Sequence, residues 1–111
     1  MIRRRIYVAG PYTKPDPVEN VKKALAVADK LFALGFAPFV PHLTHFWEIL
    51  HHHEYEDWME MDFIWLRQCH ALYRIPGESS GADREVALAK ELGIPVYHNL
   101  QSLYGAEGGT R

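Results

Sequence analysis

Apolar positions along the chain switch between short β-rich runs and longer stretches with helical spacing. The short runs are too brief for helices and are bounded by Gly or Pro, so they predict buried strands. These strands are expected at 6–9, 36–41, 71–75 and 94–100. Apolar residues three and four positions apart predict helices between the strands. These helices are expected at 17–34, 55–69 and 80–92.

The first predicted helix has clear ends, because Asp16 suits an N-cap and Gly35 suits a C-terminal stop. Its apolar stripe is expected to contain Val18, Val21, Leu25, Ala28, Leu31 and Phe32. The second helix is expected to present Trp58, Met61, Trp65, Leu66 and Cys69 on one face. The stretch "HLTHFWEILHHHEYEDW", residues 42–58, fits neither a loop nor a regular helix cleanly.

Strands that alternate with helices predict an α/β fold with a parallel sheet of four to five strands. The expected architecture is a small doubly wound, flavodoxin- or Rossmann-like three-layer sandwich. Residues 1–104 would form one domain, and "GAEGGTR", residues 105–111, a disordered tail. In such sheets, ligands bind where the loops after the strands gather. These loops are "GPYTKPDP", "PHLTHF" and "PGESSG".

Composition narrows the functional classes. A chain of 111 residues, 48% of them apolar, suits one compact domain. The formal charge is −2 and the only basic cluster is at 3–5, so no nucleic-acid polymer is expected as a partner. The chain shows no signal peptide and no long apolar span, which favours a cytoplasmic protein without a membrane partner. The single cysteine, Cys69, is expected to be a small buried hydrophobe.

Two acids occupy positions that helical spacing assigns to buried faces. Glu85 lies between Ala82 and Ala89, which belong to an apolar stripe with Val86 and Leu92. Asp62 lies inside the apolar face of the preceding helix. Glu85 could instead sit at the stripe's edge, with its carboxylate in solvent or paired with Arg84 or Arg74. Two such acids favour a polar site, because a buried carboxylate is costly unless it is hydrogen-bonded or used.

The start of the helix at 80–92 suits an anion. Ser79, Ser80 and Gly81 offer hydroxyls and backbone amides, and Ser80 with Asp83 has the spacing of a capping box. The serines could also do no more than cap the helix. Glu85, one turn further on, would be biased toward its ionised form by the helix dipole. It would then be a usable carboxylate nucleophile.

The chain resembles the nucleoside 2-deoxyribosyltransferase family and its relatives, the 2′-deoxynucleoside 5′-phosphate N-hydrolases, over roughly residues 6–97. The likeness rests on "IYVAGPYT", "EMDFIWLRQCHALYRI" and above all "SSGADREVALAKELGIPV". It implies that Glu85 attacks the anomeric carbon and that Asp62 contacts the sugar. It implies further that Tyr12 is the first-loop aromatic, and that Gly10 and Pro11 shape that loop.

Ser79 bears on the substrate that this resemblance implies. The transferases carry an Asp at this position, whereas the phosphate hydrolases carry a Ser that binds phosphate. A small-molecule 2′-deoxynucleoside, with its 5′-monophosphate favoured, is therefore the expected substrate, and no cofactor is required. Hydrolysis and base exchange both stay open, as does a non-catalytic nucleotide-binding module. The chain departs from the family at His70, where an acid is usual, and in the long segment "HFWEILHHHEYEDW", residues 45–58.

The histidines at 42, 45 and 51–53 could suggest a metal, but adjacent histidines cannot all face one ion. No metal site is therefore predicted. These histidines are expected to line the pocket or an interface, with His42 among the substrate-binding residues. The aromatic residues around them exceed what a loop over so small a sheet can bury. We therefore expect a homodimer or higher homo-oligomer that covers Phe46, Trp47, Tyr55 and Trp58.

Overall fold

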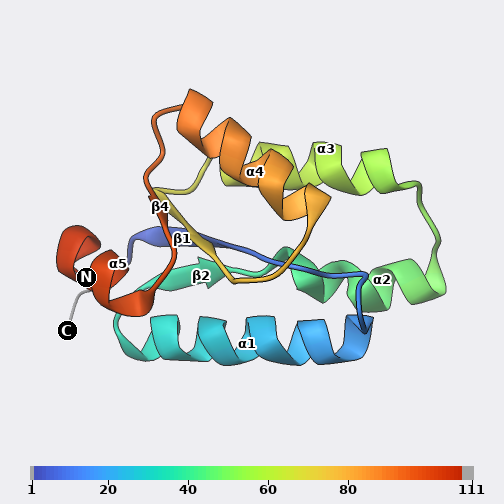
Figure 1. Ribbon diagram of the computed structural model, residues 1–111, viewed down its shortest axis with the longest axis horizontal. Coiled ribbons are helices and arrows are strands. Elements are labelled where there is room, and N and C mark those ends of the chain that lie inside the picture. The colour runs from blue at the N-terminus through green and yellow to red at the C-terminus, as the bar shows by residue number, and fades with distance from the viewer. Residues whose placement is uncertain (1, 109–111) are drawn as a thin grey trace.

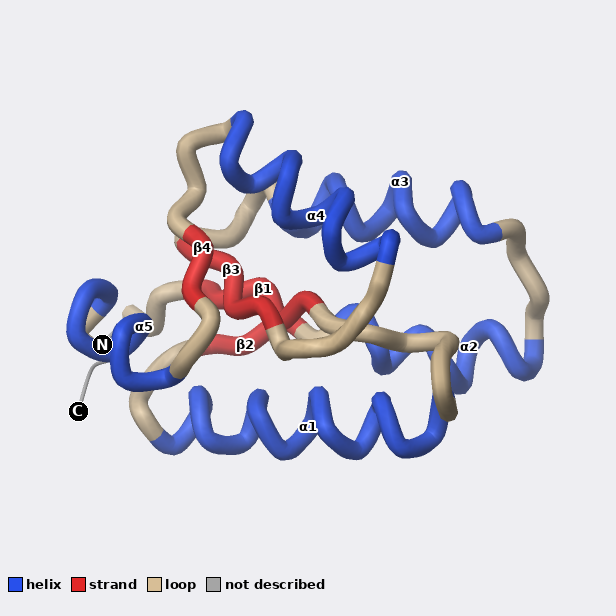
Figure 2. Tube along the Cα trace, in the orientation of Figure 1, coloured by secondary structure: helices blue, strands red, loops and turns tan. Residues whose placement is uncertain are grey.

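The computed structural model describes residues 2–108, which form an α/β domain with helices on both faces of a parallel sheet (Figure 1). Figure 2 shows the sheet enclosed between the helices. Its four strands are β1 (Arg5–Ala9), β2 (Ala37–Phe39), β3 (Ala71–Arg74) and β4 (Val96–Tyr97). The described residues contain five α-helices: α1 (Pro17–Ala33), α2 (Thr44–Leu50), α3 (Tyr55–Leu66), α4 (Ser80–Glu91) and α5 (Leu100–Glu107). The predicted α/β class with a parallel sheet of four to five strands is confirmed, with four strands among the described residues.

The order of the strands, β2-β1-β3-β4, creates a switch point between β1 and β3. The chain leaves β1 toward one edge to form β2 and later returns to the other side of β1 as β3. In sheets of this kind a crevice opens beyond the carboxyl ends of the two strands at the switch point. Gly10 follows β1 here, and a Cβ at this position would stand 2.9 Å from Ile75 Cβ. Only glycine therefore allows the two loops to approach this closely.

Two apolar clusters pack on opposite faces of the sheet. One lies beneath α1 and α5 and includes Ile6, Val8, Ala24, Leu31, Phe36, Tyr73 and Leu103. The other lies beneath α3 and α4 and includes Tyr7, Ala9, Leu66, Leu72, Ala82 and Ala89. Successive residues of β1 alternate between these clusters because side chains along a strand point to opposite faces.

Helix α1 begins and ends as expected, because Asp16 accepts a hydrogen bond from Val18 N and Gly35 has a φ of 99°. Its predicted stripe was wrong in part. Val18, Leu25 and Phe32 are 53%, 40% and 55% exposed, whereas Asn20, Val21, Ala24, Ala28 and Leu31 are buried. The helix packs on the sheet through Ala24, Ala28 and Leu31, which turns Val18, Leu25 and Phe32 toward solvent.

The predicted apolar face of α3 was also wrong in part, although Leu66 is fully buried as expected. Its buried residues are Met59, Asp62 and Leu66, while Trp65 is 48% exposed and stacks on Phe39. The helix ends at Leu66, before Cys69, which is buried as expected. Aromatic side chains are long enough to cover the rim of a helix interface, so they mislead a pattern that equates large apolar residues with the buried side.

The stretch without a sequence assignment contains a 3₁₀ turn, η1 (Pro41–Leu43), followed by α2. The predicted disordered tail is helical at its start, because α5 continues to Glu107, which accepts hydrogen bonds from Arg4 and Tyr97. The last three residues of that tail, 109–111, lie outside the described residues. Within residues 2–108, none of the helices has the length and apolar character needed to cross a membrane.

Candidate active site

A cavity of about 630 Å³ opens at the carboxyl ends of β1, β2 and β3, between the loops that follow them and the helices α2, α3 and α4. It brings together most of the residues that the sequence singled out: Gly10, Tyr12, His42, Asp62, Ser79, Ser80, Gly81 and Glu85. Pro11 lines a neighbouring cavity of about 330 Å³ instead. Segments more than 70 positions apart in sequence thus meet at the switch point of the sheet.

Glu85 lies at the centre of the buried face of α4 and is only 5% exposed. The hydroxyl of Tyr7, a fully buried residue on β1, donates a hydrogen bond of 2.5 Å to Glu85 Oε2. The arginines considered as partners are paired elsewhere. Arg84 binds both carboxylate oxygens of Glu56, and Arg74 binds Asp83 at 3.0 Å. Glu85 is therefore a buried acid inside the cavity, and its alternative placement at the stripe's edge does not hold.

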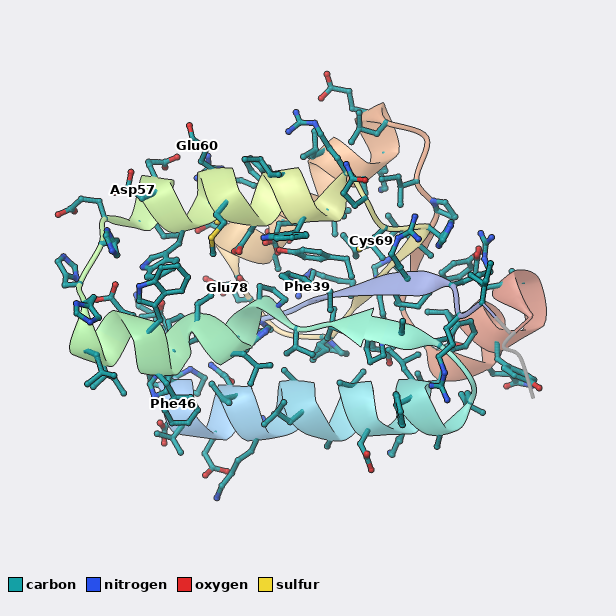
Figure 3. All side chains as sticks on the ribbon, turned by 180° about the vertical axis from the view of Figure 1, so that it is seen from behind. Phe39, Phe46, Asp57, Glu60, Cys69 and Glu78 are labelled. Atoms are coloured by element: carbon teal, nitrogen blue, oxygen red, sulfur yellow. The ribbon has the colours of Figure 1, made fainter. Side chains whose placement is uncertain are left out.

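Asp62 approaches the same cavity from α3 and is 9% exposed. Two other acids of this helix, Asp57 and Glu60, point away from the molecule (Figure 3) and are exposed. Among residues 2–108, no group hydrogen-bonds to Asp62 Oδ1. A buried carboxyl oxygen without a partner is unfavourable unless a ligand supplies the partner. Asp62 is thus placed to bind a hydroxyl or another donor in the cavity.

Burial makes both acids hold their protons near neutral pH. It raises the pKa of Asp62 to about 7 and is the largest cause that raises the pKa of Glu85 to about 8. The Tyr7 hydrogen bond opposes the shift of Glu85, and the nearby Asp62 carboxylate adds to it. The helix dipole was expected to favour ionised Glu85, and burial shifts the pKa of Glu85 in the opposite direction. Desolvation outweighs the helix dipole at this position.

The first turn of α4 forms one end of the cavity. Ser79 is its N-cap, and Ser79 Oγ accepts a hydrogen bond of 3.1 Å from Ala82 N. The predicted capping box of Ser80 and Asp83 was wrong, because the helix begins at Ser80 and Asp83 pairs with Arg74. The Ser79 hydroxyl can still donate its own hydrogen. The first N–H groups of a helix have no intrahelical acceptor and favour an anion.

Arg74 fixes the loop that leads to this end of the cavity. Its guanidinium is mostly buried and donates to the carbonyls of Ile75 and Gly77, as well as to Asp83. One arginine thereby joins the end of β3 to the first turn of α4. Ser79 and the first turn of α4 are held in place as a result.

His42 and Tyr12 hold the loops on the opposite side. His42 is 4% exposed and its Nε2 lies 3.0 Å from the carbonyl oxygen of Pro11. Burial lowers the pKa of His42, so the ring is neutral at pH 7. Tyr12 is half-buried, and its hydroxyl lies 2.6 Å from His45 Nδ1. The tyrosine that hydrogen-bonds to Glu85 is Tyr7, a residue that the sequence analysis did not single out.

Sequence reasoning missed Tyr7, although a signal was present. A tyrosine inside a short buried strand needs a partner for its hydroxyl, and the misplaced acid Glu85 could have been that partner. It also missed Glu48, which lines the cavity and binds His52, His53 and Trp58. Within residues 2–108, no group of three or more His, Cys, Asp or Glu side chains is arranged to hold a metal ion.

The strand order defines a parallel α/β protein, and its fold is shared with two solved 2-deoxyribosyltransferases. The 2-deoxyribosyltransferase of the psychrotolerant bacterium Bacillus psychrosaccharolyticus superposes with a TM-score of 0.62 at 22% identity, covering 83% of this chain and 69% of that one. The 2-deoxyribosyltransferase of Leishmania mexicana gives 0.62 at 20% identity, covering 84% of this chain and 61% of that one. At such identities the likeness is one of fold.

The chain belongs to the family described as "Domain of unknown function (DUF7768)", which matches residues 4–99. No curated protein matches it. The family match includes β1 to β4 and every residue that lines the cavity.

Proposed function

We propose that this protein cleaves or exchanges the N-glycosidic bond of 2′-deoxynucleosides, preferably 5′-monophosphates, through a glycosyl intermediate on Glu85. The observation that carries the proposal is a buried carboxyl group, held by Tyr7 and close to a second acid, inside a cavity large enough for a nucleotide. The fold shared with the 2-deoxyribosyltransferases supports it.

The proposed reaction has two displacements. The Glu85 carboxylate attacks C1′ as the bond from C1′ to the base nitrogen breaks, and the base leaves with the electron pair and takes up a proton. Water or a second base then attacks C1′, and the bond from C1′ to Glu85 breaks to restore the carboxylate. Asp62 binds a sugar hydroxyl through its Oδ1, which has no hydrogen-bond partner among residues 2–108, and the departing base takes its proton from water.

The first turn of α4 is the proposed phosphate end of the site. Ser79 can donate its hydroxyl hydrogen, and the N–H groups of Ser80 and Gly81 lie at the positive end of the helix dipole. Lys14 also lines the cavity and adds a positive charge. No cofactor takes part in this chemistry, because the leaving group is a neutral base and the nucleophile is a side chain.

The test is to measure free base by chromatography after incubation with deoxynucleosides, their 5′-monophosphates and ribonucleotides, with and without an acceptor base. We expect release from the 5′-monophosphates that rises with pH toward 8, where Glu85 loses its proton. We expect Glu85→Gln to abolish release while the protein stays folded. Release of base by folded Glu85→Gln at the wild-type rate would contradict the proposal.

The phosphate preference has a separate test at Ser79. Asp and Asn both cap helices well, so Ser79→Asp and Ser79→Asn preserve α4 and differ in charge. We expect Ser79→Asp to lower kcat/KM for the monophosphate at least tenfold more than for the nucleoside, because its carboxylate repels phosphate. Ser79→Asn is the matched control. An equal loss of kcat/KM in both variants and for both substrates would contradict a role of Ser79 in binding phosphate.

One observation favours a second function, a nucleotide-binding module without chemistry. The pKa of Glu85 lies at about 8, so most of the free protein carries a protonated acid at pH 7, and a protonated acid is no nucleophile. This alternative is expected to show nucleotide binding that Glu85→Gln leaves unchanged, with no base release at any pH from about 6 to 9.

The homo-oligomer expected from the sequence stays a prediction. Exposed apolar side chains do gather on η1 and α2: Leu43, Phe46, Trp47, Ile49 and Leu50 are each between 48% and 75% exposed. Figure 3 shows Phe46 on the α2 ribbon near α1. Sedimentation of the wild type and of Phe46→Ser would test whether this surface joins two copies.

A further inference from the structure

Residues 44–58 form one wall of the cavity. Most of this wall belongs to the segment 45–58, which has no clear counterpart in the family that the sequence resembles. The wall consists of α2, the extended segment 51–54 and the first turn of α3. It contributes Thr44, Glu48, His52, His53, Tyr55 and Trp58 to the cavity lining. The cavity therefore has an aromatic and histidine-rich wall in addition to its two buried acids.

Glu48 ties this wall together. Its Oε1 accepts hydrogen bonds from Trp58 Nε1 at 2.7 Å and from His53 N at 2.9 Å, and its Oε2 lies 2.5 Å from His52 Nδ1. These three donors, the His53 backbone first, hold the pKa of Glu48 at about 2. The carboxylate is ionised at any working pH and joins α2 to the start of α3.

The ring of Trp58 is fixed by these contacts. Its N–H is used by Glu48, and the rings of Trp47 and His53 meet it nearly at right angles, with centroids 5.1 Å and 5.4 Å away. Neither neighbour stacks parallel to it. A half-buried indole that lines a cavity and is held from several sides offers a rigid aromatic surface.

We propose that Trp58 is the platform on which the base of the bound nucleotide stacks, and that Glu48 is a positioning residue that fixes this ring. Trp58 precedes Asp62 by four residues, which is about 6 Å along a helix. A base on Trp58 therefore places the attached sugar beside Asp62 and Glu85. The proposal rests on the proposed function for the identity of the ligand, but binding of a planar base does not require cleavage.

The test measures binding in the Glu85→Gln background, so that no ligand is consumed. Calorimetry compares deoxyadenosine 5′-monophosphate, which carries a base, with 2-deoxyribose 5-phosphate, which does not. We expect Trp58→Leu to weaken the nucleotide about 5- to 150-fold, the range for loss of one base–aromatic stack. The sugar phosphate is expected to keep its affinity within about twofold.

Trp65→Leu is the matched control, because Trp65 lies on the same helix but stacks on Phe39 outside the cavity lining. It is expected to leave the affinity of both ligands unchanged. If Trp58→Leu does not fold, Trp58→Phe keeps a ring without the N–H and is expected to weaken only the nucleotide. Unchanged nucleotide affinity, or equal loss for both ligands, in the folded variant would overturn the proposal.

Glu48 is tested through the oxygen that holds the indole. Glu48→Gln retains a carbonyl oxygen for Trp58 Nε1 and His53 N, so nucleotide affinity is expected to stay within about threefold of the Glu48 protein. Glu48→Ala removes the acceptor and is expected to weaken the nucleotide about tenfold, again without effect on the sugar phosphate. Equal effects of Gln and Ala, or an equal effect on both ligands, would contradict the positioning role.

The outcomes separate this inference from the proposed function. If the protein binds the nucleotide through Trp58 but releases no base, the stacking role of Trp58 is supported and the catalytic proposal is rejected. If Trp58→Leu releases base as well as the wild type does, the stacking role of Trp58 is rejected and the catalytic proposal is supported.

Discussion

The two faces of the sheet are built from the same strands and serve different purposes. Beneath α1 and α5, Ile6 and Val8 enter a core of apolar side chains. Beneath α3 and α4, the intervening residue Tyr7 points to the other face and meets Glu85, with Asp62 nearby. One face stabilises the domain through burial of apolar surface, and the other places polar groups where burial alters their chemistry.

The two faces differ in how their contribution to the free energy of unfolding depends on pH. The folded pKa of Glu85 lies at about 8, above its ordinary value of 4.5. Between these values the folded protein keeps a proton that the unfolded chain has lost, so the free energy of unfolding falls as pH rises through this window. Asp62 acts in the same direction up to about pH 7. The face beneath α3 and α4 is therefore expected to weaken the fold as the pH rises through this window, whereas burial raises the pKa of Tyr73 on the apolar face above 10 and keeps it neutral there.

The largest expected effect on stability comes from the apolar face. Leu31 on α1 is fully buried in that core, and Leu31→Ala would leave a cavity there. We expect a loss of about 2–5 kcal/mol in the free energy of unfolding, equal at pH 6 and pH 9. Urea unfolding at both pH values measures it. A loss that changed with pH would show that the two faces are not independent.

Glu85→Gln is expected to act in the opposite direction. Glutamine has nearly the same shape as glutamate and can accept the Tyr7 hydrogen bond, but its side chain does not ionise. We expect a gain of about 2 kcal/mol at pH 9 and little change at pH 5, where the wild-type acid is already neutral. Thermal unfolding as a function of pH provides the measurement. Destabilisation at pH 9 would mean that Glu85 is not held in an unfavourable state there.

Tyr7→Phe tests how the two faces meet at β1. The hydroxyl favours the ionised form of Glu85, so its removal raises the pKa of Glu85 further. We expect stability to fall by about 1–2 kcal/mol and base release at pH 7 to fall about tenfold. Activity should recover as the pH is raised. A loss of equal size at every pH would assign Tyr7 a purely structural role.

The two helix N-caps provide the smallest and most closely matched comparison. Asp16 caps α1 and Ser79 caps α4, each through a side-chain oxygen. Asp16→Ala and Ser79→Ala are each expected to cost about 1 kcal/mol. Only Ser79→Ala should also raise KM for the 5′-monophosphate. If both variants changed KM alike, the cap of α4 would have no special part in binding.

The pattern of apolar residues was sufficient to predict the strands and the parallel α/β class. It was also sufficient to predict that Glu85 and Asp62 lie on buried helix faces. Glu85 and Asp62 stood out because helices of a small domain rarely bury an unpaired carboxylate. The loops after β1, β2 and β3 could be predicted to form one site, because ligands bind at the carboxyl ends of parallel strands. Ser79 and His42 line the cavity for this reason.

Other features depend on three-dimensional packing that spacing does not encode. The buried face of α3 passes through Met59 and Asp62, not through its tryptophans, because Trp65 covers the edge by stacking on Phe39. Tyr7 escaped notice because a strand buried on both faces shows no polar alternation. The protonation of Glu85 reflects a balance between burial and the helix dipole that the sequence does not resolve.

The most direct test of the central claim is whether substrate becomes covalently attached to Glu85. Wild-type protein and Glu85→Gln would be mixed with deoxyadenosine 5′-monophosphate at about pH 8, quenched in acid, digested and examined by mass spectrometry. We expect a deoxyribose phosphate adduct on the peptide that contains Glu85, at a level that falls with added acceptor base and is zero in Glu85→Gln. Base release by wild-type protein without any adduct, together with equal release by Glu85→Gln, would contradict it.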